Sequence, residues 1–207
     1  MARIKSSLAD VPDIAMEEDT PIDYTYGEVL PMDDVLGTFE EALIDYKAAV
    51  TRVKSADVPK AIAKFLKDKG AKSVVIPVGL EQSWIDGMGK FSVRKDDPQL
   101  TNYELNDTDA VVTAARVAIA STGSIVLDHA PDQGRRALTL VPDIHVCVVA
   151  ADQVVSDVPE SVTRLRDSVL AGLPLTFISG GSATSDIELN RVEGVHGPRK
   201  LCVVIAE

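Results

Sequence analysis

The chain has 207 residues, of which 45% are hydrophobic and 26% are charged, and its formal net charge is −11. This length and composition are typical of a single globular domain that buries its core without disulfides. The acidic balance argues against nucleic acid as the main partner, because phosphate binding needs a surplus of Lys and Arg.

The apolar stretches of the sequence are much shorter than the roughly 20 residues that a membrane span needs. No apolar segment typical of a secretory signal follows the first basic residues, Arg3 and Lys5. We therefore expect a cytoplasmic protein with no membrane span.

The first 33 residues are rich in acidic side chains and contain three prolines. Segments of this kind rarely bury enough apolar surface to fold alone. We expect residues 1–33 to form an extended arm, or a disordered segment, ahead of a single α/β domain over residues 34–207. Such an arm is also compatible with a homo-oligomer.

Two helices are expected at the start of the domain. An apolar stripe at three- and four-residue spacing predicts a helix over residues 35–46, and residues 48–53 follow as a short strand. Asp57 marks the start of a second helix with a proline in its first turn, and Gly70 ends it. The apolar run 73–77 then follows as a buried strand, a succession typical of parallel α/β units.

The middle of the chain is less clearly patterned. Residues 79–105 indicate loops and irregular structure, in which Trp84 is expected to be a packing residue. Thr108 is a suitable cap for a short helix that would run to Ala115. Further along, Asp157 begins a predicted helix with an apolar stripe.

Four runs rich in β-branched residues lack the alternation of a half-exposed strand, which suits strands covered on both faces. They comprise residues 125–127, 144–149, 175–178 and 201–205. The predicted fold class is therefore α/β, with a Rossmann-like, mostly parallel sheet that is covered by helices on both faces.

Cysteine and histidine are scarce. Cys147 and Cys202 each lie in an apolar run, where a free cysteine behaves as a small hydrophobic residue. The chain has no Cys-x-x-Cys pair and only three histidines. We therefore expect two buried thiols, and no metal or other cofactor held by this chain alone.

The first candidate site is the loop Ser121-Thr122-Gly123-Ser124, which precedes a predicted strand. Small hydroxyl residues around a glycine allow backbone N–H groups to approach an anion. Thr122, Gly123 and Ser124 are therefore candidate ligand-binding residues, although an ordinary turn explains this loop equally well.

The second candidate site is the Gly-rich stretch 179–188, directly after a predicted strand. In open α/β sheets, ligands bind where strands end, so Ser182, Ser185 and Asp186 are candidate binding residues. Glu188 is a candidate general acid–base, with a solvated side chain as its alternative. The stretch lacks the spacing of a P-loop or a dinucleotide-binding fingerprint.

The remaining candidates are basic side chains in loops. His196 lies between two glycines and is a candidate catalytic group, with a structural role as the alternative. Arg199 follows it, and the turn Gln133-Gly-Arg135-Arg136 supplies two further guanidiniums for an anion. His145 lies inside an apolar run and is expected to be buried and hydrogen-bonded.

Several of these motifs together resemble the LUD-domain family, and the resemblance is closest to the lactate-utilisation C-type proteins. The motifs are Thr122-Gly-Ser-Ile-Val-Leu127, Gly134-Arg-Arg136 followed by residues 140–145, residues 182–188, and Arg191-Val-Glu-Gly-Val-His-Gly-Pro-Arg199. The resemblance is strong over residues 108–207. Two positions depart from the pattern, since many members have Pro where this chain has Gly181 and Glu where it has Ser121.

The resemblance implies a fold similar to the superfamily of ribose-phosphate isomerase and CoA transferases. It also implies a role in oxidising L-lactate to pyruvate together with iron–sulfur partner proteins, with a small phosphate or carboxylate ligand bound by this chain. Two alternatives are an independent enzyme acting on a sugar phosphate or acyl-CoA, and a non-catalytic assembly subunit.

Overall fold

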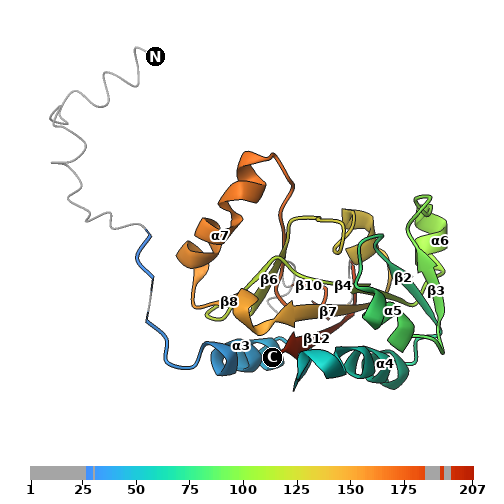
Figure 1. Ribbon diagram of the computed structural model, residues 1–207, viewed down its shortest axis with the longest axis horizontal. Helices are drawn as coiled ribbons and strands as arrows, with labels where there is room; N and C mark the ends of the chain where they lie inside the picture. The colour runs from blue at the N-terminus through green and yellow to red at the C-terminus, as the bar shows by residue number, and fades with distance from the viewer. Residues whose placement is uncertain (1–26, 30, 185–191, 194–196) are drawn as a thin grey trace, which may run out of the picture.

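A parallel six-stranded sheet forms the centre of the computed structural model, which describes residues 27–29, 31–184, 192–193 and 197–207. Its strand order is β1-β12-β7-β4-β2-β3, and every neighbouring pair is parallel (Figure 1). The strands are β1 (Ala49–Val53), β2 (Ser73–Ile76), β3 (Ser92–Lys95), β4 (Ala110–Thr113), β7 (Ile144–Ala150) and β12 (Lys200–Ala206). The α/β fold class predicted from the sequence is confirmed.

A second sheet has the order β8-β5-β6-β9. In it β6 pairs antiparallel with both β5 and β9, whereas β5 and β8 are parallel. Its strands are β5 (Val117–Ile119), β6 (Ser124–Leu127), β8 (Val154–Val155) and β9 (Thr176–Ile178), and β10 (Ala183–Thr184) pairs with β11 (Val192–Glu193) in a separate ribbon. Two of the four predicted strand runs thus belong to this sheet and not to the parallel one.

The longer helices are α3 (Val35–Asp45), α4 (Val58–Asp68) and α7 (Val158–Leu170). The Asp34 carboxylate caps α3 by accepting a 2.8 Å hydrogen bond from the Gly37 N–H. Asp157 caps α7 in the same way. Asp57 precedes α4 without a side-chain capping bond, and its carboxylate instead pairs with Lys60 at 2.7 Å.

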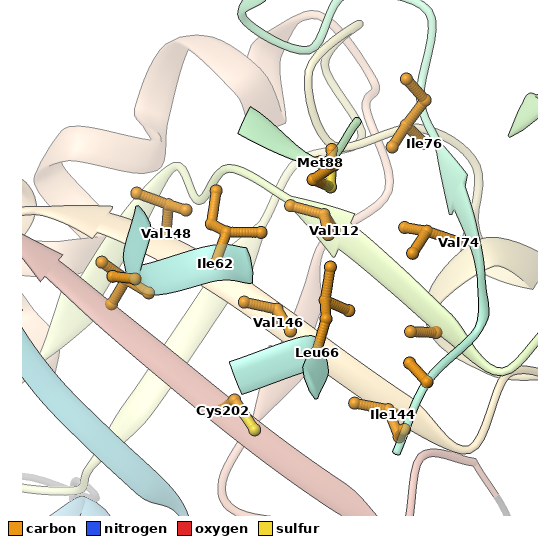
Figure 2. Close-up of a cluster of buried hydrophobic side chains, with 14 of the residues drawn as sticks. Ile62, Leu66, Val74, Ile76, Met88, Val112, Ile144, Val146, Val148 and Cys202 are labelled. Atoms are coloured by element: carbon orange, nitrogen blue, oxygen red, sulfur yellow. The ribbon is translucent and has the colours of Figure 1, made fainter. Parts of the chain in front are cut away.

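The face of the parallel sheet that α4 covers forms the first part of the core (Figure 2). Ile62 and Leu66 of α4 are fully buried against alternate residues of the central strands. Val146 and Val148 of β7 point to this side, and Trp84 packs on the cluster as predicted. Burial of such aliphatic side chains contributes roughly 1.5–3 kcal/mol each.

The opposite face of the parallel sheet is covered by α3 and by the second sheet. Phe39 and Leu43 of α3 pack with Cys147 and Val149 of β7 and with Ile125 of β6. The far side of the second sheet packs in turn on α7, which lies at the opposite end of the molecule from β3 and α6 in Figure 1. This layering places β6 and β9 directly beside the parallel sheet.

The middle of the chain differs from the sequence prediction. Residues 79–105 contain α5 (Gln82–Gly87), β3 and the start of α6 (Asn102–Asn106), and not only loops. The helix predicted from Thr108 to Ala115 is wrong, because residues 110–113 form strand β4. Val111, Val112 and Thr113 are β-branched and fully buried, which favours a central strand.

Three short 3₁₀ helices complete the described structure: η1 (Ser55–Asp57), η2 (Arg136–Thr139) and η3 (Ala151–Gln153). Within the described ranges, every helix is too short or too polar to span a bilayer. Cys147 and Cys202 are free and buried, as predicted. Burial raises the pKa of the Cys147 thiol to about 12 and that of Cys202 to about 11.

Candidate functional site

A pocket of about 250 Å³ lies where the two sheets meet. Its walls come from η2, from the first residues of β7 and β12, and from the Gly-rich stretch after β9. The polar side chains that line it belong to Arg136, Thr139, His145, Ser179 and Ser182. The pocket therefore brings residues from four segments, far apart in the sequence, around one small space.

His145 is the most deeply buried polar group of this pocket, with 1% of its surface exposed. Its Nε2 lies 2.8 Å from the Thr113 Oγ1 on the neighbouring strand β4. Burial, together with the positive charge of Arg136, lowers the pKa of His145 to about 4. The imidazole is therefore neutral at pH 7, and the prediction of a buried, hydrogen-bonded histidine is confirmed.

Arg136 is the guanidinium that lines the pocket. Its Nη1 donates to the carbonyl oxygen of Thr139 at 3.0 Å and to Thr139 Oγ1 at 3.3 Å. These bonds anchor one edge of the guanidinium to η2. A fixed guanidinium at the mouth of a small polar pocket suits the binding of a carboxylate or phosphate.

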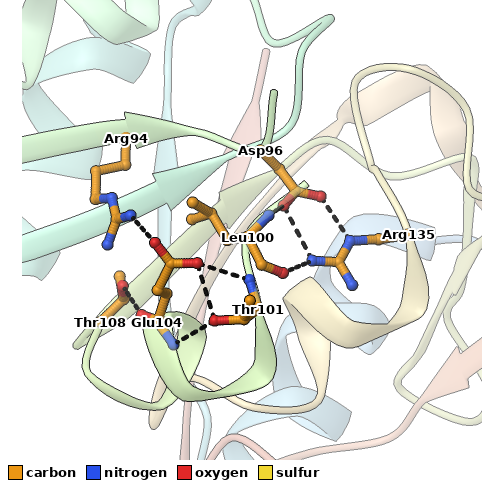
Figure 3. Close-up of polar contacts among 7 residues, drawn as sticks. All are labelled: Arg94, Asp96, Leu100, Thr101, Glu104, Thr108 and Arg135. Carbon is orange, nitrogen blue, oxygen red and sulfur yellow. Dashed lines mark hydrogen bonds and ion pairs between the residues drawn. The ribbon is translucent and has the colours of Figure 1, made fainter. Parts of the chain in front are cut away.

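Arg135, the candidate taken from the sequence, is held in a different network (Figure 3). Its Nε and Nη2 donate to the two carboxylate oxygens of Asp96 at 2.7 and 3.0 Å, and Nη2 also donates to the Leu100 carbonyl. Burial raises the pKa of Asp96, but the bonds from Arg135 and the Leu100 N–H outweigh it and leave the pKa below its ordinary value. Arg135, at the start of η2, thus holds the segment that follows β3.

The loop at residues 121–124 adjoins the Gly-rich stretch after β9. Ser124 Oγ lies 2.7 Å from Ser179 Oγ, and Thr122 Oγ1 donates to Ser124 Oγ at 2.9 Å. Gly123 has a φ of +58°, and a Cβ there would lie 2.9 Å from the Cβ of Ala42 in α3. The hydroxyls therefore link the two candidate loops, while Gly123 serves the packing against α3.

The Gly-rich stretch is held against the segment before β12. The Ser182 N–H donates to the Pro198 carbonyl at 2.8 Å. A Cβ on Gly181 would lie 2.8 Å from the Arg199 carbonyl oxygen, so in this chain the two backbones approach too closely for an added Cβ to fit without a shift. Arg199 itself is largely exposed, and its Nε lies 3.2 Å from an Asp143 oxygen.

Four of the candidate residues lie outside the described residues: Ser185, Asp186, Glu188 and His196. The predicted catalytic pair, Glu188 and His196, therefore remains a prediction. Among the residues that the structure describes, no group of three or more His, Cys, Asp or Glu side chains is arranged to hold a metal ion.

The position of the pocket in the sheets is unusual for an α/β protein. The stretch 179–182 follows the carboxyl end of β9, as predicted, but β9 belongs to the second sheet. His145 and Leu201 are the second residues of β7 and β12, so the pocket lies near the amino ends of these parallel strands.

A separate cavity of about 550 Å³ lies beyond the carboxyl ends of β2 and β3, and Arg136 also lines it.

The sequence offered both arginines of the turn Arg135-Arg136 as anion-binding groups, and Arg136 is the one that lines this pocket. His145 was expected only to be buried and hydrogen-bonded, although a polar residue inside an apolar strand was a usable signal. Which of two adjacent arginines faces a pocket depends on the backbone of η2, which the sequence pattern does not define.

Comparison with known proteins agrees with this architecture. The family model of the LUD domain matches residues 36–206. The chain is 52% identical to lactate utilization protein C of Deinococcus radiodurans over 173 residues, which cover 83% of this chain and 79% of that protein. It is 25% identical to lactate utilization protein C of Shouchella clausii, over 84% of this chain and 80% of that protein.

A solved structure extends the comparison to three dimensions. The crystal structure of a DUF162 family protein from Deinococcus radiodurans has a TM-score of 0.74 and 45% sequence identity to this chain. The match covers 86% of this chain and 99% of that one. The family model, the similar proteins and the shared fold show that the chain belongs to the LUD-domain family.

Proposed function

We propose that this protein is a cytoplasmic component of an L-lactate utilisation system and acts with iron–sulfur partner proteins. The observation that carries the proposal is the 52% identity, over 83% of this chain, to a protein named lactate utilization protein C. The name of the Shouchella clausii relative agrees with it.

The proposed system oxidises L-lactate to pyruvate. This reaction removes two electrons and two protons from lactate, so an electron acceptor must take part. Iron–sulfur clusters accept electrons singly and are held by cysteine thiolates. We assign the clusters to the partner proteins, in line with the family resemblance.

The pocket supports a role in binding a small anion. Arg136 offers a guanidinium, and Ser179 and Ser182 offer hydroxyl groups around the same space. A volume of about 250 Å³ lies below the roughly 300–1,000 Å³ of sites for drug-sized ligands. This size favours a small carboxylate or phosphate over an acyl-CoA as the occupant.

Deletion of the gene in its native host tests the proposal. The deletion strain is expected to grow poorly with L-lactate as the only carbon source and normally with pyruvate. A plasmid copy of the intact gene should restore growth on L-lactate. Normal growth of the deletion strain on L-lactate would overturn the proposal.

A further inference from the structure

A groove rimmed by lysines lies on the face of the molecule away from the pocket. It has a volume of about 740 Å³ and runs between α4 and the segment that follows α5. Its floor is apolar and includes Pro59, Ala63, Gly87 and Phe91. Its rim carries four lysines, namely Lys60, Lys64, Lys67 and Lys90, and a single acidic residue, Asp68.

These lysines form a local basic surface on an acidic protein. Residues 54–95 hold nine basic and four acidic side chains, whereas the whole chain has a net charge of −11. Lys60 is paired with Asp57 at 2.7 Å. Within the described part of the chain, Lys64, Lys67 and Lys90 make no ion pair.

The N-terminal stretch has the opposite composition. Residues 8–24 contain six acidic side chains, and no Lys or Arg occurs between Lys5 and Lys47. Apolar side chains alternate with the acids in this stretch, namely Leu8, Val11, Ile14, Met16, Ile22 and Tyr24. Such a segment can present carboxylates to a basic rim and apolar groups to the floor between them.

We propose that residues 8–24 of the chain dock in the groove between α4 and α5 of the same molecule. Tyr24 precedes α3 by 11 residues, which can span up to about 36 Å. Both α3 and α4 contact β1, the edge strand of the parallel sheet, from opposite faces, so the segment would reach the groove by passing around this edge. Tethering gives the segment an effective concentration on the order of mM at the groove, which favours its own chain over a separate partner.

Zero-length carbodiimide crosslinking of the full chain, read by mass spectrometry, tests the docking. Amide crosslinks are expected between the carboxylates of residues 10–23 and the amines of Lys64, Lys67 or Lys90. They should fall at least about tenfold when the salt concentration is raised to about 1 M, where the screening length is about 3 Å. Crosslinks of these carboxylates only to lysines outside the groove, or no crosslinks at all, would overturn the proposal.

A charge-reversal pair supplies the matched control. Lys64→Glu with Lys90→Glu should abolish the crosslinks to Lys67, whereas Lys95→Glu with Lys200→Glu, two exposed positions away from the groove, should preserve them. Circular dichroism shows whether each variant is folded. If a variant does not fold, the salt dependence of crosslinking in the unaltered chain still tests the docking.

Mixing normal and heavy-isotope chains before crosslinking distinguishes the occupants. Crosslinks within single chains are expected. Crosslinks that join a light to a heavy chain would place the segment in the groove of a second copy and would contradict the intramolecular docking.

Discussion

The hydroxyl of Thr113 and the ring of His145 are joined by a 2.8 Å contact between neighbouring parallel strands, β4 and β7. This contact satisfies a polar side chain at the base of the pocket, between two strands whose other residues are aliphatic apart from Cys147. The positive charge of Arg136 in the same pocket also disfavours protonation of His145. Protonation of His145 should therefore destabilise the fold and add a positive charge to the pocket.

The stability of the protein should fall as the pH drops from about 6.5 to about 4. In this range the unfolded chain protonates His145, whereas the folded chain, in which its pKa is about 4, does not. The contribution of neutral His145 to the free energy of unfolding is therefore fully present above pH 6.5. Below that pH the free energy of unfolding falls by up to about 1.4 kcal/mol per pH unit. Urea unfolding at several pH values measures this slope.

The variant His145→Asn should reduce that slope, because it removes the group that titrates. Thr113→Val serves as the control, since it alters the same contact but keeps the buried histidine and the pH dependence. An unchanged slope in His145→Asn would show that other groups cause the pH dependence.

Substitution of Asp96 should destabilise the fold. Asp96→Asn leaves the Arg135 guanidinium without its counter-charge in a site where the Asp96 side chain is only 6% exposed. Breaking a buried pair in this way should cost about 2–3 kcal/mol in the free energy of unfolding, measured by urea titration.

The neighbouring surface pair offers the comparison. The Arg94 and Glu104 side chains are each at least 40% exposed, and their paired atoms lie 2.8 Å apart. Figure 3 draws this ion pair beside the Arg135–Asp96 pair. Arg94→Gln should therefore cost less than about 1 kcal/mol. Equal losses in the two variants would contradict a structural role for the Arg135–Asp96 pair.

Introducing a side chain at Gly181 should disturb the edge of the pocket. The Cβ of Gly181→Ala would lie 2.8 Å from a backbone oxygen of Arg199, and such crowding typically costs about 1–3 kcal/mol. At Gly89 the nearest atom to an added Cβ lies at 3.5 Å, so Gly89→Ala should have little effect. Thermal unfolding compares the two variants, and equal melting temperatures would contradict the close backbone approach.

Removing the pocket guanidinium should weaken anion binding. We expect L-lactate or inorganic phosphate to bind the unaltered protein and to bind Arg136→Gln at least about tenfold more weakly, because a charge-assisted hydrogen bond contributes about 1.5–3 kcal/mol. Isothermal titration calorimetry measures both affinities, with Arg94→Gln as the control for a lost surface charge. If Arg136→Gln bound the anion as tightly as the unaltered protein, Arg136 would be excluded as the anion-binding residue.

The sequence predicted those parts of the fold that local patterns define. The buried run from Ile144 to Val149 and the helix after Asp157 were confirmed, because composition and capping residues decide them locally. Thr101 and Glu104 form a capping box at the start of α6, a local signal that the weak pattern around it obscured.

The parts that the sequence did not predict depend on contacts between distant segments. Nothing local shows that β6 pairs with β9 in a second sheet, or that Ser124 meets Ser179 across 55 positions. Likewise, Arg135 and Arg136 have the same chemistry, and only the fold directs one to Asp96 and the other to the pocket. The sequence therefore indicated loops that line the pocket, whereas the choice between the two arginines depends on the fold.

Affinity purification of the tagged protein from its native host grown on L-lactate tests the central proposal most directly. We predict that mass spectrometry recovers two iron–sulfur proteins with it, in greater amounts than from cells grown on pyruvate. Recovery of this chain alone under both conditions would contradict its action within a lactate-oxidising system.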